Sequence, residues 1–154
     1  MIVLDTSVVV KWFVLEESGC ERARAIRGLH FRGDIEIIVP SLTLYELCSA
    51  LGRREWVPDE VDEALRLLER AGIVVVRPSR RVLVRAAELC RRRATSFYDE
   101  LFVALAELAG AHLITADEEH YAKARDSAQV HLLTDLDISD VPRWHREAGV
   151  QDRA

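Results

Sequence analysis

The chain has 154 residues, 49% hydrophobic and 31% charged, a composition typical of a single soluble globular domain. No apolar run approaches the roughly 20 residues that a membrane-spanning helix needs, and no basic segment precedes the first apolar residues as in a secretory signal. Three cysteines without a CxxC pair argue against a disulfide framework or a cysteine zinc site, so we expect a cytoplasmic protein. The net charge of −5 disfavours nucleic acid as a partner, unless a bound cation neutralises a cluster of acids.

Short apolar runs alternate with amphipathic stretches along the chain. In chain order we expect a strand at Ile2–Leu4, helices at Val8–Phe13 and Glu21–Leu29, a strand at Ile35–Val39, a helix from Ser41 or Thr43 through Leu51, a helix at Asp59–Ala71, a strand at Ile73–Val76, helices at Val82–Arg93 and Ser96–Leu108, a strand at His112–Thr115, a helix at Glu118–Arg125 and a strand at Val130–Leu133. The valines after Ser7 could instead prolong the first strand.

Strands separated by helices pair in parallel through right-handed crossovers. The order therefore predicts an α/β fold, a three-layer α/β/α sandwich with a central parallel five-stranded sheet. We expect one domain over residues 1–154, with a peripheral tail after about residue 142. In such sheets, ligands bind outside the carboxyl ends of the strands.

Four acids fall near that edge of the predicted sheet. Asp5 directly follows the first strand, and Asp117 follows the fourth. Glu46 lies in the first turns of the helix after the second strand, and Asp99 opens the helix before the fourth. Each acid alone could be a helix cap or a solvated side chain. Together they would repel one another unless a cation lay between them, and oxygen ligands favour Mg²⁺ or Mn²⁺ over zinc.

A metal held by carboxylates binds phosphate oxygens and activates water, which suggests hydrolysis of a phosphodiester. Four segments in order carry a further signal, namely Val3–Phe13, Val39–Leu47, Tyr98–Ala106 and Leu113–Asp117. Each pairs an apolar stretch with one of the four acids, and together they resemble the motifs of PIN-domain proteins. The set is most similar to the ribonuclease toxins of VapBC-type toxin–antitoxin pairs.

The resemblance implies an endoribonuclease that depends on one or two Mg²⁺ or Mn²⁺ ions and leaves a 5′-phosphate and a 3′-hydroxyl. It implies that the catalytic and metal-binding residues are Asp5, Glu46, Asp99 and Asp117, supported by Thr6, Ser7 and Thr115. It also implies an RNA substrate, a cognate antitoxin protein and a homodimer. One departure is Ser49, three residues after the glutamate, where many members have asparagine.

Other residues could serve the substrate or a partner. Arg91, Arg92 and Arg93 precede the Asp99 helix and could meet a phosphate backbone, although a solvated helix end is an equal reading. Trp12, Phe13 and Trp56 could stack on bases or lie in a protein interface, and the resemblance favours the antitoxin groove. His120, three residues after Asp117, could approach the metal or be a core histidine.

Two functions other than RNA hydrolysis remain open. One is a PIN-like protein that only binds nucleic acid or a protein partner, and the other is a structure-specific DNA nuclease of the same broad fold. A dinucleotide-binding fold is a poor fit, because the turn after the first strand is Asp5-Thr6-Ser7 and lacks glycine.

Overall fold

A computed structural model describes residues 1–14, 18–127 and 129–144 of the chain. Its sheet is five-stranded and all-parallel, with the strand order β3-β2-β1-β4-β5. The strands are β1 (Ile2–Leu4), β2 (Ile37–Pro40), β3 (Val74–Val76), β4 (His112–Thr115) and β5 (Val130–Leu132). The predicted central parallel sheet is therefore confirmed.

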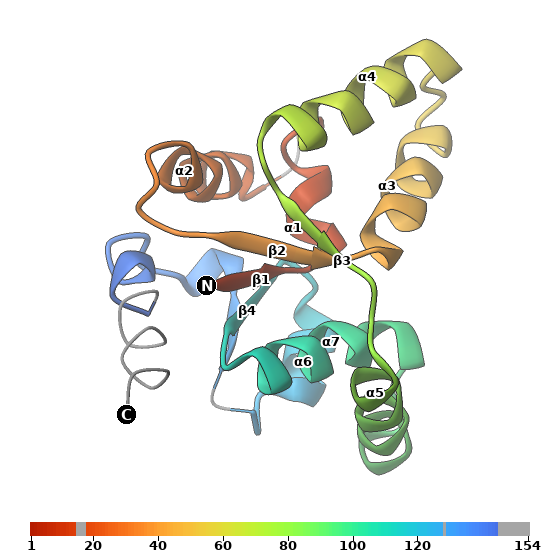
Figure 1. Ribbon diagram of the computed structural model, residues 1–154, viewed down its shortest axis with the longest axis vertical. Helices are drawn as coiled ribbons and strands as arrows, with labels where there is room; N and C mark the ends of the chain where they lie inside the picture. The colour runs from red at the N-terminus through yellow and green to blue at the C-terminus, as the bar shows by residue number, and fades with distance from the viewer. Residues whose placement is uncertain (15–17, 128, 145–154) are drawn as a thin grey trace.

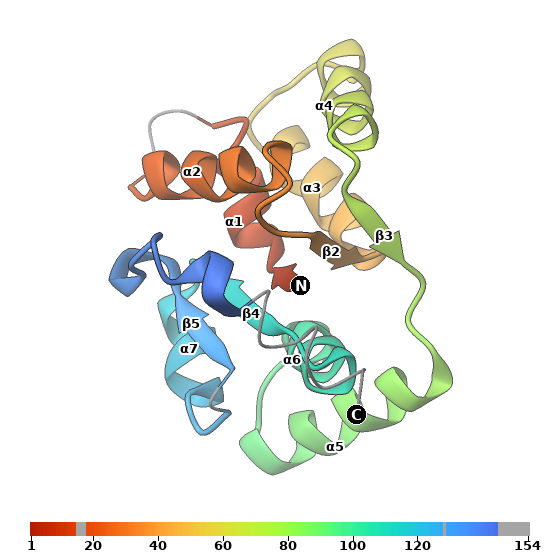
Figure 2. The same cartoon turned by 60° about the vertical axis from the view of Figure 1, so that its left-hand side comes forward.

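Helices cover both faces of the sheet (Figure 1). One layer holds α1 (Thr6–Val10), α2 (Cys20–Phe31), α3 (Leu42–Gly52) and α4 (Pro58–Arg70). The other layer holds α5 (Arg80–Arg93), α6 (Phe97–Ala109) and α7 (Glu118–Ala124). Figure 2 shows α7 beside β5, which leads into a short 3-10 turn at Leu133–Asp135. The three-layer sandwich is thus as predicted, and none of the described helices is long and apolar enough to cross a membrane.

The strands β1 and β2 at the middle of the sheet are unbroken apolar runs because both of their faces are buried, whereas Val74 and Val75 of the edge strand β3 are exposed. In β1, Ile2 and Leu4 pack with the layer of α1 to α4, whereas Val3 packs with α5 and α6. Ile37 and Ile38 of β2 divide between the two layers in the same way. Alternation along each strand therefore supplies two hydrophobic cores, one on each side of the sheet.

Most differences from the expected elements are shifts of one or two residues at their ends. Val8 to Val10 continue α1 rather than β1, since Asp5 caps the helix by accepting a hydrogen bond from the Ser7 amide. The strand expected at residues 35–39 begins at Ile37 and includes Pro40. The proline fits there because the amide of Ser41, the next residue, donates to Val76 of β3. The helices that begin at the carboxyl edge of the sheet, α1, α3 and α6, start within two residues of their predicted positions.

A buried ion pair joins α5 to α6. Arg93 Nη1 donates to Glu100 Oε2 at 2.7 Å, and the two side chains are 5% and 0% exposed. Thr95 donates to the other oxygen of the same carboxylate at 2.7 Å. Between the helices, Ala94 adopts a left-handed conformation with φ of 53°, which turns the chain back sharply. This corner places the first turn of α6, and hence Asp99, at the carboxyl edge of the sheet.

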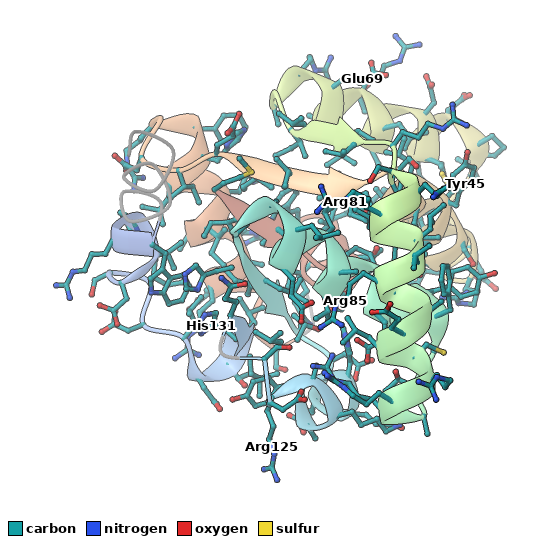
Figure 3. All side chains as sticks on the ribbon, turned by 60° about the horizontal axis from the view of Figure 1, so that its bottom comes forward. Tyr45, Glu69, Arg81, Arg85, Arg125 and His131 are labelled. Carbon is teal, nitrogen blue, oxygen red and sulfur yellow. The ribbon has the colours of Figure 1, made fainter. Side chains whose placement is uncertain are left out.

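Three rings stack at the β5 side of the sheet. The ring of Trp144 lies 4.1 Å from His131 and 4.6 Å from His112, centroid to centroid. His131 appears beside the C-terminal part of the described chain in Figure 3. Burial, and then the charge of His112, lower the pKa of His131 from 6.5 to about 4. The remainder of the expected tail, residues 145–154, lies outside the described residues.

This lowered pKa predicts a pH-dependent stability. Below pH 6.5 the unfolded chain takes up a proton on His131 that the folded chain does not bind until about pH 4, so the free energy of unfolding falls across that window. His131→Phe keeps an aromatic ring against Trp144 and removes the titration. In urea unfolding at pH 7.5 and 4.5, we expect the variant to gain stability relative to the wild type at the lower pH. If the free energies of unfolding of the variant and the wild type differ by the same amount at both pH values, this expectation is contradicted.

Candidate active site

A cleft of about 830 Å³ opens at the carboxyl edge of the sheet, between the first turns of α1, α3 and α6. All four predicted acids line it, and they come from four separate segments of the chain. Asp5 follows β1, Glu46 lies in α3, Asp99 lies in the first turn of α6, and Asp117 precedes α7. The sheet topology thus brings together side chains that are up to 112 residues apart in the sequence.

Asp5 is the most buried of the four. Its Oδ2 accepts a hydrogen bond from Thr115 Oγ1 at 2.9 Å and lies 3.3 Å from Nδ1 of His120. Its Oδ1 accepts from the Ser7 amide at 2.8 Å. Burial alone would raise the pKa of Asp5, but the hydrogen bonds from His120, Ser7 and Thr115 outweigh it, and the pKa lies below its ordinary value. The fold therefore holds Asp5 as a carboxylate.

Glu46 is half-buried on the facing wall. Its Oε2 accepts a hydrogen bond of 2.6 Å from Thr6 Oγ1, which fixes the carboxylate against α1. Burial raises the pKa of Glu46, and although the Thr6 hydroxyl lowers it, the charges of Asp5 and Asp99 raise it further. Burial and the charges of Asp5 and Asp99 thus disfavour the ionised form of Glu46.

Asp99 lies in the first turn of α6, which is capped by Ser96. Burial raises its pKa, and the nearby charges of Asp5 and Asp117 raise it further, against a lowering influence of His120. Asp117 is exposed and caps α7 by accepting a 2.9 Å hydrogen bond from the His120 amide. The repulsion among the acids is therefore a property of the folded site.

The three predicted supporting residues all contact this site. Thr6 holds Glu46 and Thr115 holds Asp5, as described above. Ser7 Oγ accepts from the amide of Ala116 at 2.9 Å, and this bond ties α1 to the loop after β4. Side-chain hydroxyls therefore fix two of the carboxylates and join two of the segments that carry them.

The donor set suits a hard divalent cation, because it consists of carboxylate oxygens that line one cleft, where the charges of neighbouring acids help to raise the pKa of Glu46 and Asp99. Within the described part of the chain, no three His, Cys, Asp or Glu side chains are grouped closely enough to hold an ion as they stand. The acids thus line one cleft, but they are not arranged as a preformed coordination sphere.

The sequence matches the PIN domain family over residues 2–126. The chain belongs to the PIN domain family. That stretch covers β1 to α7 and includes all four acids of the cleft. No curated protein sequence matches the chain. Membership of the PIN domain family agrees with the resemblance found in the four motifs.

Solved structures share this PIN fold at low sequence identity. A toxin–antitoxin complex from Klebsiella pneumoniae aligns with a TM-score of 0.66 at 14% identity, covering 86% of this chain and 98% of that one. PAE2754 from Pyrobaculum aerophilum aligns with a TM-score of 0.64 at 20% identity, covering 92% and 96%. FitAcB from Neisseria gonorrhoeae aligns with a TM-score of 0.58 at 20% identity, covering 86% and 96%. At these identities the likeness shows the fold alone.

The predicted phosphate-binding arginines lie elsewhere. Among the described residues, the lining of the cleft does not include Arg91, Arg92 or Arg93. Arg93 is buried against Glu100, and Arg92 pairs with Asp126 at 3.4 Å. The basic side chains that do line the cleft are Lys11, Arg53 and Arg54. Arg53 and Arg54 directly follow α3, the helix that carries Glu46, and this position in the sequence is the signal that could have identified them.

His120 has a role that its spacing only hinted at. It is 3% exposed, and its ring lies behind Asp5, with Nε2 buried and without a hydrogen-bond partner among the described residues. Burial lowers its pKa, but the hydrogen bond and charge of Asp5 outweigh burial and raise it overall. His120 thus contacts Asp5, and this contact helps to fix the position of the Asp5 carboxylate.

The tryptophans lie apart from the acids. Trp12 is buried and donates from Nε1 to the carbonyl of Ala23 at 2.8 Å. Phe13 and Trp56 meet edge to face, with 6.4 Å between ring centroids, and line a second groove of about 430 Å³ along α4. Phe13 and Trp56 therefore lie at a groove along α4, and Trp12 lies in the core, so none of the three rings lines the candidate active site.

Proposed function

We propose that the protein is a metal-dependent endoribonuclease that hydrolyses RNA phosphodiester bonds and is the toxin of a toxin–antitoxin pair. One observation carries the proposal: four carboxylates from four segments line one cleft, where burial and the charges of neighbouring acids raise the pKa of Glu46 and of Asp99. The cost of gathering these charges is offset only when a cation binds among them. Membership of the PIN domain family supports a nuclease.

In this proposal Asp5, Glu46, Asp99 and Asp117 hold Mg²⁺ or Mn²⁺, which would activate water and offset charge on the phosphoryl group. Water adds to phosphorus and the bond to the 3′ oxygen breaks, which leaves a 5′-phosphate and a 3′-hydroxyl. Thr6 and Thr115 hold Glu46 and Asp5 in place by their hydroxyl hydrogen bonds. Because these bonds form within the fold, two of the carboxylates need little reorganisation when substrate arrives.

The first test is removal of the metal. Purified protein is expected to cut single-stranded RNA with Mg²⁺ present, to lose that activity in EDTA, and to regain it when Mg²⁺ is restored in excess. Mg²⁺ should also raise the Tm of the protein without RNA, because a ligand that binds only the folded state stabilises it. Cleavage that persists in EDTA after dialysis would exclude the metal mechanism.

The same experiment separates the alternatives. A PIN protein that only binds nucleic acid or protein partners should show neither cleavage nor a metal-dependent rise in Tm. A DNA nuclease should cut single-stranded or structured DNA faster than RNA of the same sequence. Only cleavage of RNA in preference to DNA, together with metal-dependent stabilisation, agrees with the proposed function.

We place the antitoxin in the groove along α4. The groove has an aromatic floor from Phe13 and Trp56 and an acidic rim from Asp59, Glu60 and Glu63. An amphipathic segment with apolar anchors and basic flanks would suit this combination. The first of the similar structures is itself described as a toxin–antitoxin complex, which supports a protein partner of this kind. The proposal also includes a homodimer, which rests on the family resemblance.

A further inference from the structure

Two exposed tyrosines face the same cleft from opposite helical layers. Tyr45 of α3 is 73% exposed and Tyr98 of α6 is 59% exposed, and both line the cleft of the four acids. Figure 3 shows Tyr45 at the outer edge of the molecule, beside α3. Most of the surface of each ring is thus exposed to solvent at the walls of an acidic cleft and is free to contact a bound ligand.

We propose that the cleft takes a single-stranded stretch of RNA, whose bases stack on Tyr45 and Tyr98 on either side of the phosphate that is cut. This inference rests on the proposed function and names the form of its substrate. An aromatic ring can stack on the face of any base, provided that the base is not already stacked within a duplex.

The placement of the rings relative to the acids supports this. Each tyrosine directly precedes a cleft carboxylate, Tyr45 before Glu46 and Tyr98 before Asp99. Successive residues of a helix project about 100° apart, so each ring flanks its acid instead of covering it. Phe97 packs edge-on against Tyr98, with ring centroids 5.9 Å apart, and this limits the orientations open to the tyrosine.

A polar stripe continues from Tyr45 along α3. Ser49 and Arg53 follow at intervals of four residues, so the three side chains lie on one side of the helix, and all three line the cleft. Arg53 Nη1 donates to Ser49 Oγ at 2.7 Å, which holds the guanidinium over this face. Tyr45 and Arg53 are about 12 Å apart along the helix axis. A base on Tyr45 and a neighbouring phosphate on Arg53 would therefore follow one strand away from the acids.

The test measures binding separately from cleavage. A short fluorescein-labelled single-stranded RNA is titrated with the Asp99→Asn protein, and anisotropy reports the Kd. In this background Tyr45→Ala and Tyr98→Ala are each expected to weaken binding about thirtyfold, the middle of the range for stacking of one base on one ring. Tyr45→Trp and Tyr98→Phe should restore most of the affinity. Phe31→Ala is the matched control, since Phe31 is 62% exposed on α2 and does not line the cleft.

A second arm uses the RNA instead of the protein. The same oligonucleotide with its bases replaced by abasic sites should bind the parent about as weakly as the tyrosine variants bind intact RNA, and the variants should lose little more on it. Duplex RNA of the same sequence should be insensitive to both substitutions.

Alanine variants that bind intact RNA within twofold of the parent, or a parent that does not bind single-stranded RNA, would overturn the inference. An equal loss on duplex RNA would also overturn it. If the stacking dependence is found but no variant or wild-type protein cuts RNA with Mg²⁺, the proposed nuclease fails while the binding mode stands. The two failures are thus distinguishable.

Discussion

Asp99→Asn is expected to reduce RNA cleavage by at least about a hundredfold, since a catalytic metal contributes several kcal/mol to the transition state and this substitution removes one of its ligands. The same substitution should raise the Tm of the metal-free protein. The pKa of Asp99 is raised by burial and by the charges of Asp5 and Asp117, so the folded state favours the neutral form. Asparagine supplies that neutral form at every pH.

Asp5→Asn separates catalysis from stability. It should abolish cleavage as fully as Asp99→Asn, but it should lower the Tm of the metal-free protein. The pKa of Asp5 lies below its ordinary value because His120, Ser7 and Thr115 stabilise the carboxylate, so the folded state favours the charged form. Opposite changes in Tm, with the same loss of activity, are difficult to obtain from a general disturbance of the fold.

The measurements are cleavage of a labelled RNA with Mg²⁺ and thermal unfolding in EDTA at pH 7. Glu118→Gln is a matched control, because Glu118 is an exposed acid that follows Asp117 directly and does not line the cleft. Its activity should stay close to that of the wild type. Full activity of Asp99→Asn would exclude the proposed site, whatever its effect on Tm.

Glu100→Ala is expected to destabilise the protein by about 3 kcal/mol, near the lower end for breaking a buried ion pair. The substitution leaves Arg93, 5% exposed, without its buried carboxylate, and leaves the Thr95 hydroxyl without its acceptor. The effect should not be larger, because Arg93 also donates to Asp126 and Ser127. Urea unfolding at pH 7 gives the free energy directly.

Two further variants test whether burial of the ion pair causes the loss of stability expected for Glu100→Ala. Asp62→Ala breaks an ion pair with Arg66 that is more than half exposed on both sides, and stability should change little. Arg93→Met combined with Glu100→Leu removes both buried charges, and should recover much of the loss caused by Glu100→Ala. A double variant no more stable than Glu100→Ala alone would show that the lost packing, and not the unpaired arginine, dominates.

Much of the fold followed from local pattern. The short apolar runs predicted the strands, and the alternation of strands with helices predicted parallel pairing. Asp5 and Asp117 could be placed at one edge because each lies within two residues of the end of a strand. Asp99 was harder to place, since its position depends on the left-handed corner at Ala94 and on the Arg93–Glu100 pair.

The basic residues show the limit of such reasoning. Arg91, Arg92 and Arg93 precede the Asp99 helix in the sequence, but the corner after α5 directs Arg93 into an ion pair with Glu100. Residues that are close in the sequence can lie far apart in space where the chain reverses direction between two helices, as it does at Ala94. The spacing of His120 from Asp117 placed it on the correct side of α7, but not against Asp5, which is 115 residues away.

The sequence by itself determined the fold class and the order of strands and helices along the chain, because these depend on the period of the hydrophobic residues, and it singled out four acids near one predicted edge of the sheet. Only the tertiary structure decided which hydroxyl holds which acid, which of the basic residues line the same cleft, and that two tyrosines flank the acids. Such contacts join segments 40 to 115 residues apart, and their formation depends on how the helices pack on the sheet rather than on local propensity.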